Sequence, residues 1–261
     1  MVAADAKDEK FDRTEISCGF LIFHFYKEVL LMTKTKFNTQ RLTTSAVMLA
    51  LAAILAMVCA LIPFLNLPFG GGFTIASMLP IIIVSYMYGV KWGLFTSAVY
   101  SIIQIVMDLY LGKGSTIIAL FMPNGDEFMG YGAAVAILII DYLVAYSVLG
   151  FGGIFRNKIK NKTLALSLGV AFALLLRYLA HIISGFIFYG AWAEWFFSQE
   201  NFYSIGGWIL DSFSGQILAL VYSIFYNGLY MIPEIVITVV AAVAVSKIPV
   251  IKIQSKESNT N

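Results

Sequence analysis

The stretch Arg177-Tyr178-Leu179-Ala180-His181-Ile182-Ile183-Ser184-Gly185-Phe186-Ile187-Phe188-Tyr189 lies inside an apolar run that is long enough to cross a bilayer. Arginine and histidine are costly in hydrocarbon, so their presence at this depth marks a candidate functional face. Arg177, His181, Gly185 and Tyr189 follow one another at intervals of four residues. On a helix they form one slowly drifting stripe, which carries a cation, an imidazole, a gap without a side chain and a phenol.

The composition of the chain is that of an integral membrane protein. Of its 261 residues, 60% are hydrophobic and only 12% are charged, and the mean hydropathy is +0.84. Apolar runs of about 18 or more residues recur along the chain, which indicates a polytopic α-helical membrane protein. The runs are continuous rather than alternating, so a β-barrel is disfavoured.

The sequence offers little support for soluble or cofactor-dependent chemistry. Cys18 and Cys59 are the only cysteines, and they indicate neither a disulfide framework nor a metal cluster. No phosphate-binding loop occurs, and no polar stretch is long enough to form a nucleotide-binding domain. We therefore expect no metal, no cofactor and no nucleic-acid partner.

Six membrane spans are predicted, at residues 42–62, 74–90, 92–111, 132–151, 163–190 and 217–246. Loop 63–73 contains two prolines and three consecutive glycines, a composition suited to a lid or a re-entrant turn. Loop 191–216 holds three tryptophans and predicts an aromatic segment at the membrane interface.

The first 31 residues resemble neither a signal peptide nor a membrane span. Met32 is followed by a basic, polar stretch that is a suitable cytoplasmic start, so we expect translation to begin there. The predicted organisation is a dispensable extension at 1–31, a six-helix integral membrane domain at 32–249 and a cytoplasmic polar tail at 250–261.

Lysine and arginine residues are unevenly distributed between the two sides of the membrane. Basic residues precede span one, separate spans two and three, separate spans four and five, and follow span six, whereas the other side holds only Lys113. This asymmetry places both termini in the cytoplasm. No convincing internal repeat is visible, which argues against an inverted-repeat secondary transporter.

Polar residues of spans four, five and six fall at overlapping depths in the outer half of the membrane. Asp141 lies about nine residues into span four and Asn227 about ten residues into span six, at about 1.5 Å of depth per residue. His181 lies in the outer part of span five. Because ionisable groups are costly at such depths, we expect these side chains to line a polar, aromatic pocket that opens outward.

Each of these residues also has a purely structural interpretation. Asp141 and Arg177 would form an ion pair between helices, and Asn227 would join two helices by hydrogen bonds. The tyrosines would be packing or interfacial side chains. Glu234 would partner Arg177 or mark a helix break, and Asp108 is expected near the membrane interface.

Span one presents alanines at helical spacing. Ala46 and Ala50 lie four residues apart, and small side chains at that spacing let another helix approach closely. This face predicts a partner helix, within the chain or outside it.

Taken together, these motifs resemble those of the thiamine-specific substrate-binding membrane subunits (S-components) of energy-coupling factor (ECF) transporters, from about Phe37 to Pro249. The resemblance is carried by Asp141-Tyr142 in span four, by Arg177-x-x-x-His181-x-x-x-Gly185-x-x-x-Tyr189 in span five and by Tyr222-x-x-x-x-Asn227 in span six. Tyr100 falls where the family places an aromatic wall. Ala46 and Ala50 fit the motif by which the family contacts its shared coupling subunit.

The resemblance implies a six-helix bundle in a bacterial plasma membrane. The resemblance also implies that the chain captures thiamine with high affinity and works with a transmembrane coupling subunit and two ABC ATPases. The implied ligand-binding residues are Asp141, Tyr142, His181, Gly185, Tyr189, Tyr222, Asn227, Tyr100 and Arg177. In the family the subunit topples in the membrane, and loop 63–73 would act as the outer lid.

The chemistry of thiamine agrees with this implied site. A carboxylate such as Asp141 can accept hydrogen bonds from the aminopyrimidine edge and offset the positive thiazolium ring. Tyrosines can stack on both rings and hold the cation over an aromatic face. His181 and Asn227 can supply polar contacts, whereas the cation of Arg177 would orient or neutralise a carboxylate.

Three alternatives remain open. The first is an S-component that binds a related vitamin or precursor. The second is a solitary proton-coupled thiamine symporter, in which Asp141 or Glu234 would titrate. The third is an intramembrane enzyme that uses His181 and Asp141; it is disfavoured because no nucleophile or metal triad is visible, so we expect no enzyme.

Overall fold

The computed structural model describes residues 39–67, 72–111, 116–123, 125 and 128–247. The chain divides into two units at Thr43 and Thr44, and the site lies in the second unit, Thr44–Asn261. The expectations for residues 1–31 and 250–261, including the start at Met32, fall outside the described residues.

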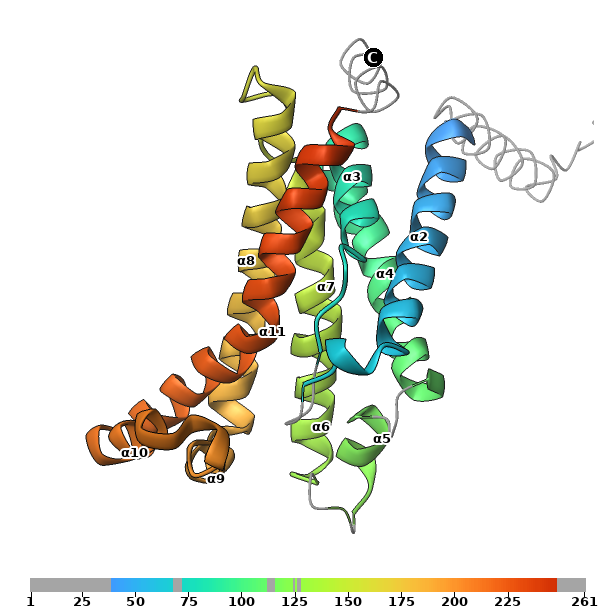
Figure 1. Ribbon diagram of the computed structural model, residues 1–261. Helices are drawn as coiled ribbons and strands as arrows, with labels where there is room; N and C mark the ends of the chain where they lie inside the picture. The colour runs from blue at the N-terminus through green and yellow to red at the C-terminus, as the bar shows by residue number, and fades with distance from the viewer. Residues whose placement is uncertain (1–38, 68–71, 112–115, 124, 126–127, 248–261) are drawn as a thin grey trace, which may run out of the picture. The chain divides into compact units, whose positions relative to one another are not determined.

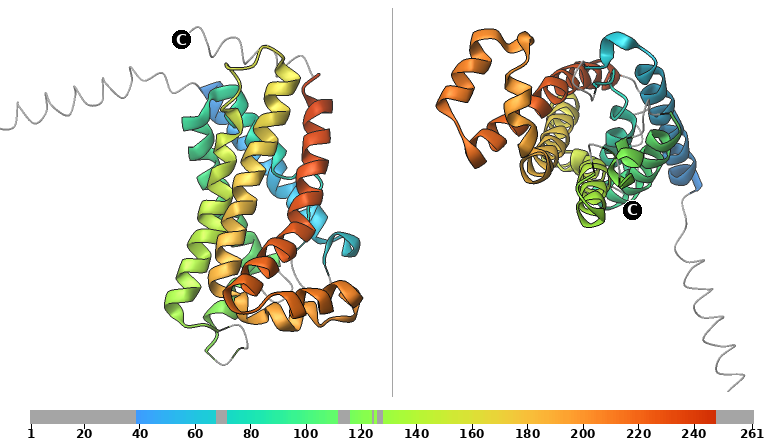
Figure 2. Two further views of the ribbon diagram at one scale, coloured as in Figure 1. Left: turned by 90° about the vertical axis from the view of Figure 1, so that its left-hand side faces the viewer. Right: turned by 90° about the horizontal axis from the view of Figure 1, so that it is seen from below.

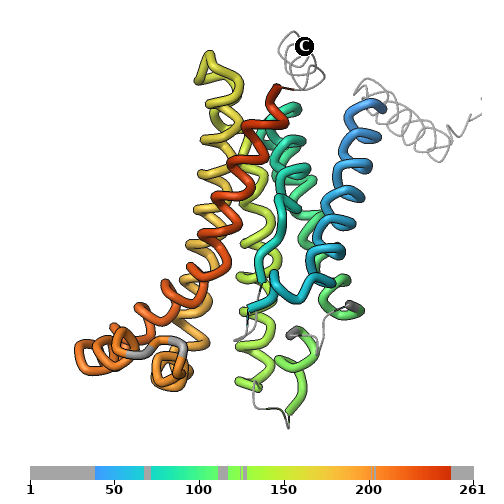
Figure 3. The backbone as a smooth tube through the Cα atoms, in the orientation of Figure 1, coloured from blue at the N-terminus to red at the C-terminus, as the bar shows by residue number. Residues whose placement is uncertain are grey.

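Five helical stretches are long and apolar enough to cross a membrane, which confirms an all-α membrane protein. They are α2 (Thr39–Ala60), α4 (Val90–Leu111), a rod at Tyr131–Gly153, α8 (Lys162–Phe188) and α11 (Gly215–Val245). In the described residues the secondary structure is helical, apart from an isolated antiparallel bridge between Asn66 and Gly72. Figure 1 shows α8, α11 and the rod side by side, and Figure 3 traces the same path.

The predicted second span differs from the structure. Helix α3 covers only Leu79–Tyr88, so residues 74–78 of the predicted span are not helical. Pro80 occupies the first turn of α3, where its missing N–H costs nothing and its fixed φ suits a helix start. Upstream, Ala76 has φ 57°, a left-handed conformation that a continuing helix cannot contain. We call Phe73–Met78 the pre-α3 segment.

The rod at Tyr131–Gly153 is not a uniform α-helix. It begins as α6 (Tyr131–Ile137), widens into a π-helical turn, η2 (Leu138–Val144), and returns through α7 (Ala145–Ser147) to a 3₁₀ end, η3 (Val148–Gly153). π-Helical turns are rare and are frequent at functional sites. Asp141 and Tyr142 both lie in this turn.

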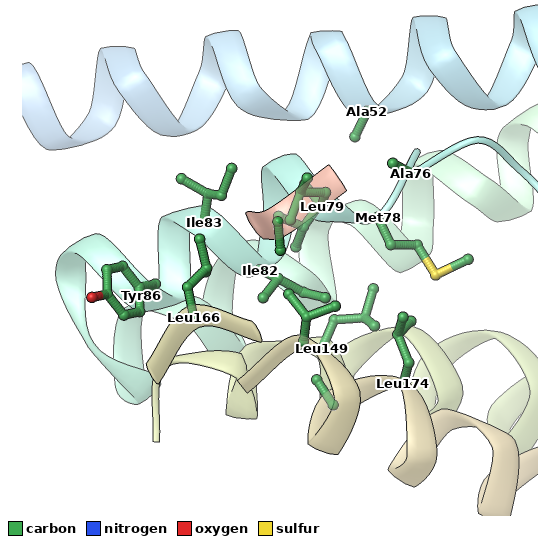
Figure 4. Packing of buried hydrophobic residues seen from close by; sticks show 14 of the residues in the cluster. Ala52, Ala76, Met78, Leu79, Ile82, Ile83, Tyr86, Leu149, Leu166 and Leu174 are labelled. Carbon is green, nitrogen blue, oxygen red and sulfur yellow. The ribbon is translucent and has the colours of Figure 1, made fainter. Parts of the chain in front are cut away.

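Close packing of α3, α4, α8 and the rod fixes the position of that turn. The Ser85 hydroxyl donates to the Gly150 carbonyl and accepts from the Gly153 amide at 2.9 Å. A side chain at Gly169 would collide with the backbone of Gly152, so α8 and the rod are in near backbone contact. Figure 4 shows the adjoining core, where Ile82, Leu149, Leu166 and Leu174 interdigitate.

Short helices gather at one end of the second unit, the lower end in Figure 1. They are η1 (Pro63–Leu65), α5 (Thr116–Phe121), η4 (Gly190–Trp192), α9 (Ala193–Phe197), η5 (Glu200–Phe202) and α10 (Tyr203–Ser212). The α3–α4 junction, the turn between η3 and α8, and the C-terminal end of α11 lie at the opposite end, as Figures 1 and 2 both show. Loop 191–216, expected as an aromatic segment, is therefore largely helical.

Candidate functional site

The carboxylate of Asp141 joins the π-helical turn to α8. Its Oδ1 lies 2.8 Å from His181 Nδ1, and its Oδ2 accepts a hydrogen bond from the Ser184 hydroxyl at 2.6 Å. His181 and Ser184 are three residues apart on α8, so they present their polar atoms to the same side. Both carboxylate oxygens therefore already have a protein partner, and Asp141 retains a side-chain exposure of 19%.

The pairing with Asp141 sets the chemical character of His181. A carboxylate accepts hydrogen bonds, so the neutral imidazole carries its proton on Nδ1 and offers a lone pair at Nε2. His181 is 9% exposed, and Nε2 is buried with no hydrogen-bond partner among the described residues. A buried polar atom without a partner is costly, so Nε2 is the natural position for a ligand donor.

Asn227 joins α11 to α8. Its Nδ2 donates to the His181 carbonyl at 3.2 Å and to the Ser223 carbonyl at 2.8 Å, and its Oδ1 accepts from the Tyr230 hydroxyl. Gly185 permits this contact, because a Cβ at that position would overlap the Ser223 hydroxyl. Asn227 thus joins the two helices and Gly185 lets them approach closely, as the structural interpretation of Asn227 expects.

The ion pair considered between Asp141 and Arg177 is not formed; the carboxylate pairs with His181 instead. The Arg177 guanidinium carbon lies 4.4 Å from the centre of the Tyr146 ring, a cation–π contact. Its Nη1 lies 2.7 Å from the Met78 sulfur, and its Nε is buried without a hydrogen-bond partner in the described part of the chain.

Tyrosines of α4 and the rod form a wall next to Arg177. Tyr100 is fully buried, meets Tyr146 edge to face at 5.6 Å between ring centroids and lies 2.5 Å from Gln104 Nε2. Tyr142 lies 6.5 Å from Tyr146. The Tyr142 hydroxyl hydrogen-bonds Asp108, whose carboxylate also accepts from the Ile117 amide of α5 at 3.1 Å.

Tyr222 and Tyr189 belong to a second aromatic cluster, built around α9. Tyr222 lies 5.2 Å from Phe196, ring centre to ring centre, and Tyr189 packs against the same cluster. This cluster reaches the imidazole through Tyr226 and Tyr230, whose ring centroids are 6.3 Å apart, and Tyr230 lies 5.9 Å from the His181 ring. The structure therefore places Tyr222 and Tyr189 in the aromatic cluster around α9.

Three residues of the site were missed by sequence reasoning, namely Tyr146, Ser184 and Tyr230. Each lies three or four residues from a predicted site residue on the same helical stretch, Tyr142, His181 and Asn227 respectively. Helical spacing alone would have found them. We call Asp141, His181, Ser184, Asn227 and Tyr230 the polar cluster.

Ala46 and Ala50 lie apart from the polar cluster, on α2, and both are exposed. The neighbouring Val47 and Leu51 are also exposed, at 60% and 44%. The predicted role of these alanines in partner contact stays a prediction.

The fold and site define a multi-pass α-helical membrane protein with a buried polar cluster contributed by the rod, α8 and α11. Residues 42–205 match a family model described as thiamine transporter protein. The thiamine transporter ThiT of Bacillus subtilis (strain 168) is 30% identical over 206 residues, which cover 76% of this chain and 85% of the relative. This chain belongs to the thiamine transporter protein family.

Membership confirms the family resemblance and places the chain in the cell membrane as a multi-pass protein. Because the family and the relative are transporters, the chain is not an enzyme, and the intramembrane-enzyme alternative falls.

Proposed function

We propose that this chain is the thiamine-binding subunit of an ECF-type importer. It captures the vitamin from outside and delivers it inward together with a transmembrane coupling subunit and two ABC ATPases. Family membership supports thiamine as the ligand. The sequence contains no phosphate-binding loop, which is consistent with an energy source in partner subunits.

The observation that carries this proposal is the imidazole of His181, held at Nδ1 by Asp141 and unpartnered at Nε2. Nε2 can accept a hydrogen bond from the amino group of an aminopyrimidine. In this arrangement Asp141 acts chiefly by orienting His181 and by its charge, since both its oxygens are already hydrogen-bonded.

The formal charges of the buried residues suit a cationic ligand. Asp141, Glu234 and Asp108 are acidic residues of this region, whereas Arg177 is the basic residue that contacts Tyr146 and Met78. A thiazolium ring would add a positive charge near these acidic side chains. Tyr142, Tyr100 and the tyrosines of the second cluster would supply aromatic faces to its rings.

We further propose that the chain crosses the membrane six times, with both termini in the cytoplasm. The pre-α3 segment and α3 together would form the second crossing. The membrane domain would span 32–249, between a dispensable extension at 1–31 and a polar tail at 250–261. Ala46 and Ala50 would meet the coupling subunit.

Titration of the purified, detergent-solubilised chain with thiamine tests the binding role. We expect one-to-one saturable binding without any partner, followed by tryptophan fluorescence or by heat. His181→Phe should weaken binding about tenfold or more, because it removes the hydrogen-bond acceptor at Nε2. Absence of binding by the wild-type chain would contradict the proposal.

Two further experiments separate the alternatives. Competition of thiamine with its pyrimidine precursors and its phosphorylated forms tests the first alternative. A different ligand would be identified by binding more tightly than thiamine. Uptake in cells that lack the ECF ATPases distinguishes the importer subunit, which should fail to transport, from a solitary proton-coupled symporter, which should continue.

A further inference from the structure

The carboxylate of Glu234 is buried, yet it belongs neither to the polar cluster nor to the tyrosine wall. It lies on α11 with an exposure of 2%. Its Oε2 accepts a hydrogen bond from the Thr74 amide at 2.5 Å, and the Thr74 hydroxyl lies 2.8 Å and 2.9 Å from its two oxygens. Glu234 therefore binds the pre-α3 segment through both the backbone and a side chain.

The pre-α3 segment needs such a partner. Non-helical backbone is tolerated at membrane depth only where its polar groups find partners within the protein. Phe73 N donates to the Leu65 carbonyl at 3.1 Å and Ile75 N contacts the Cys59 sulfur of α2 at 3.2 Å, so Glu234 supplies the partner for the amide between them. Figure 1 shows the segment as the teal coil that leads into α3.

The segment is also strained and lies against the site. Ala76 has a positive φ, a conformation of a non-glycine residue that persists only when its surroundings enforce it. Thr74 and Ser77 share a hydrogen bond of 2.6 Å between their hydroxyls, which closes a turn around Ala76. At the end of this turn, the Met78 sulfur lies 2.7 Å from Arg177 Nη1.

We propose that Glu234 is a positioning residue that holds the pre-α3 segment against the site and thereby sets how long a ligand stays bound. Loss of the contact with Thr74 releases the segment, and Met78 then leaves Arg177. The ligand dissociates faster, whereas its association changes little, because the polar cluster itself is intact. The ligand part of this inference rests on the proposed function, but the structural part does not.

Cys59 provides a direct reporter of the segment. It is 4% exposed, and its sulfur is contacted by the Ile75 amide. The chain has two cysteines, so Cys18→Ser leaves Cys59 as the sole thiol. The rate of reaction of Cys59 with N-ethylmaleimide then measures how often the segment moves away, in the full-length chain and without any ligand.

Paired variants of Thr74 separate the hydroxyl contact from the bulk of the side chain. Thr74→Val keeps the shape and removes the hydroxyl, and Thr74→Ser keeps the hydroxyl. We expect Cys59 to react about tenfold faster or more in Thr74→Val and in Glu234→Gln, and near the wild-type rate in Thr74→Ser. The matched control is Thr96→Val, since the buried Thr96 hydroxyl donates to the Trp92 carbonyl of its own helix at 3.0 Å.

Thiamine dissociation is measured by chasing bound ligand with excess competitor. It should be about tenfold faster in Thr74→Val and Glu234→Gln, whereas the association rate should stay within about twofold of wild type. Equal Cys59 reactivity in Thr74→Val, Thr74→Ser and wild type overturns the inference. If wild type fails to bind thiamine, the proposed function falls, and the Cys59 rates still decide the role of Glu234.

A measurement on the wild-type chain tests the inference even if the variants fail to fold. Hydrogen exchange of the Thr74 amide should be strongly protected, because its acceptor is a buried carboxylate. Exchange at the rate of a solvent-exposed amide would overturn the inference.

Discussion

At the residue scale, the single carboxylate of Asp141 holds two polar side chains of α8 in place. Its two oxygens receive His181 Nδ1 at 2.8 Å and the Ser184 hydroxyl at 2.6 Å. The first contact fixes the ring orientation and the tautomer of His181, as carboxylates do for metal-binding histidines. We expect the negative charge of Asp141 to favour a cationic ligand.

Asp141→Asn tests this role. An amide keeps the shape of the carboxylate but loses the charge. Its nitrogen donates hydrogen bonds, so asparagine can accept from His181 or from Ser184 but not from both with separate atoms. We expect thiamine affinity to fall about tenfold or more, since a hydrogen bond to a charged group contributes roughly 1.5–3 kcal/mol. Calorimetric titration measures the change.

The matched control for this substitution is Asp211→Asn, an exposed aspartate on α10. It should leave affinity unchanged. If Asp141→Asn binds thiamine as tightly as wild type, Asp141 has no part in the site.

At the element scale, five of the predicted spans agree closely with helices of the structure, because long apolar runs decide where a chain can cross a membrane. The second span was predicted as a helix from Thr74, and the structure begins α3 at Leu79. Hydropathy does not distinguish a helix from apolar, non-helical backbone. Here the non-helical Thr74 amide is bonded by Glu234, which is distant in the sequence.

The candidate site was predictable in part, because helical spacing shows which residues share a face. Spacing along α8 brought Arg177 and His181 to one face, and both are buried on that helix. The pairing of Asp141 with His181 rather than with Arg177 depends on how the π-helical turn sets the aspartate. No periodicity of three to four residues signals such a turn, so the partner of each charge could not be read from the sequence.

Helix α2 carries a prediction of its own, because the sequence assigns it to a partner. Replacement of both Ala46 and Ala50 by leucine should abolish uptake in cells that contain the coupling module and leave thiamine binding to the purified chain unchanged. The bulky side chains would keep the partner helix at a distance, whereas the polar cluster lies on other helices. Uptake of labelled thiamine, alongside the binding titration, measures both effects.

Val47→Leu is the control for α2, since Val47 is exposed on a neighbouring face of the same helix. It should transport normally. Undiminished uptake by the double leucine variant would show that Ala46 and Ala50 do not meet the coupling subunit.

At the scale of the whole molecule, charge is segregated between the two ends of the second unit. The turn between η3 and α8 carries Arg156, Lys158 and Lys160, and the α3–α4 junction at the same end carries Lys91. The short helices at the other end carry acidic residues, among them Glu194 and Glu200. Basic residues stay on the cytoplasmic side, so the basic end should face inward.

Single cysteines in a chain without Cys18 and Cys59 test this orientation together with the number of crossings. With a membrane-impermeant maleimide on intact cells, we expect Glu194→Cys to be labelled, and Lys160→Cys and Lys91→Cys to be labelled only after permeabilisation. Lys91 decides the second crossing, because it follows α3, whose 10 residues are too few to span a bilayer unaided. Labelling of Lys91→Cys from outside would mean that the pre-α3 segment and α3 turn back without crossing, and the six-span topology would be wrong.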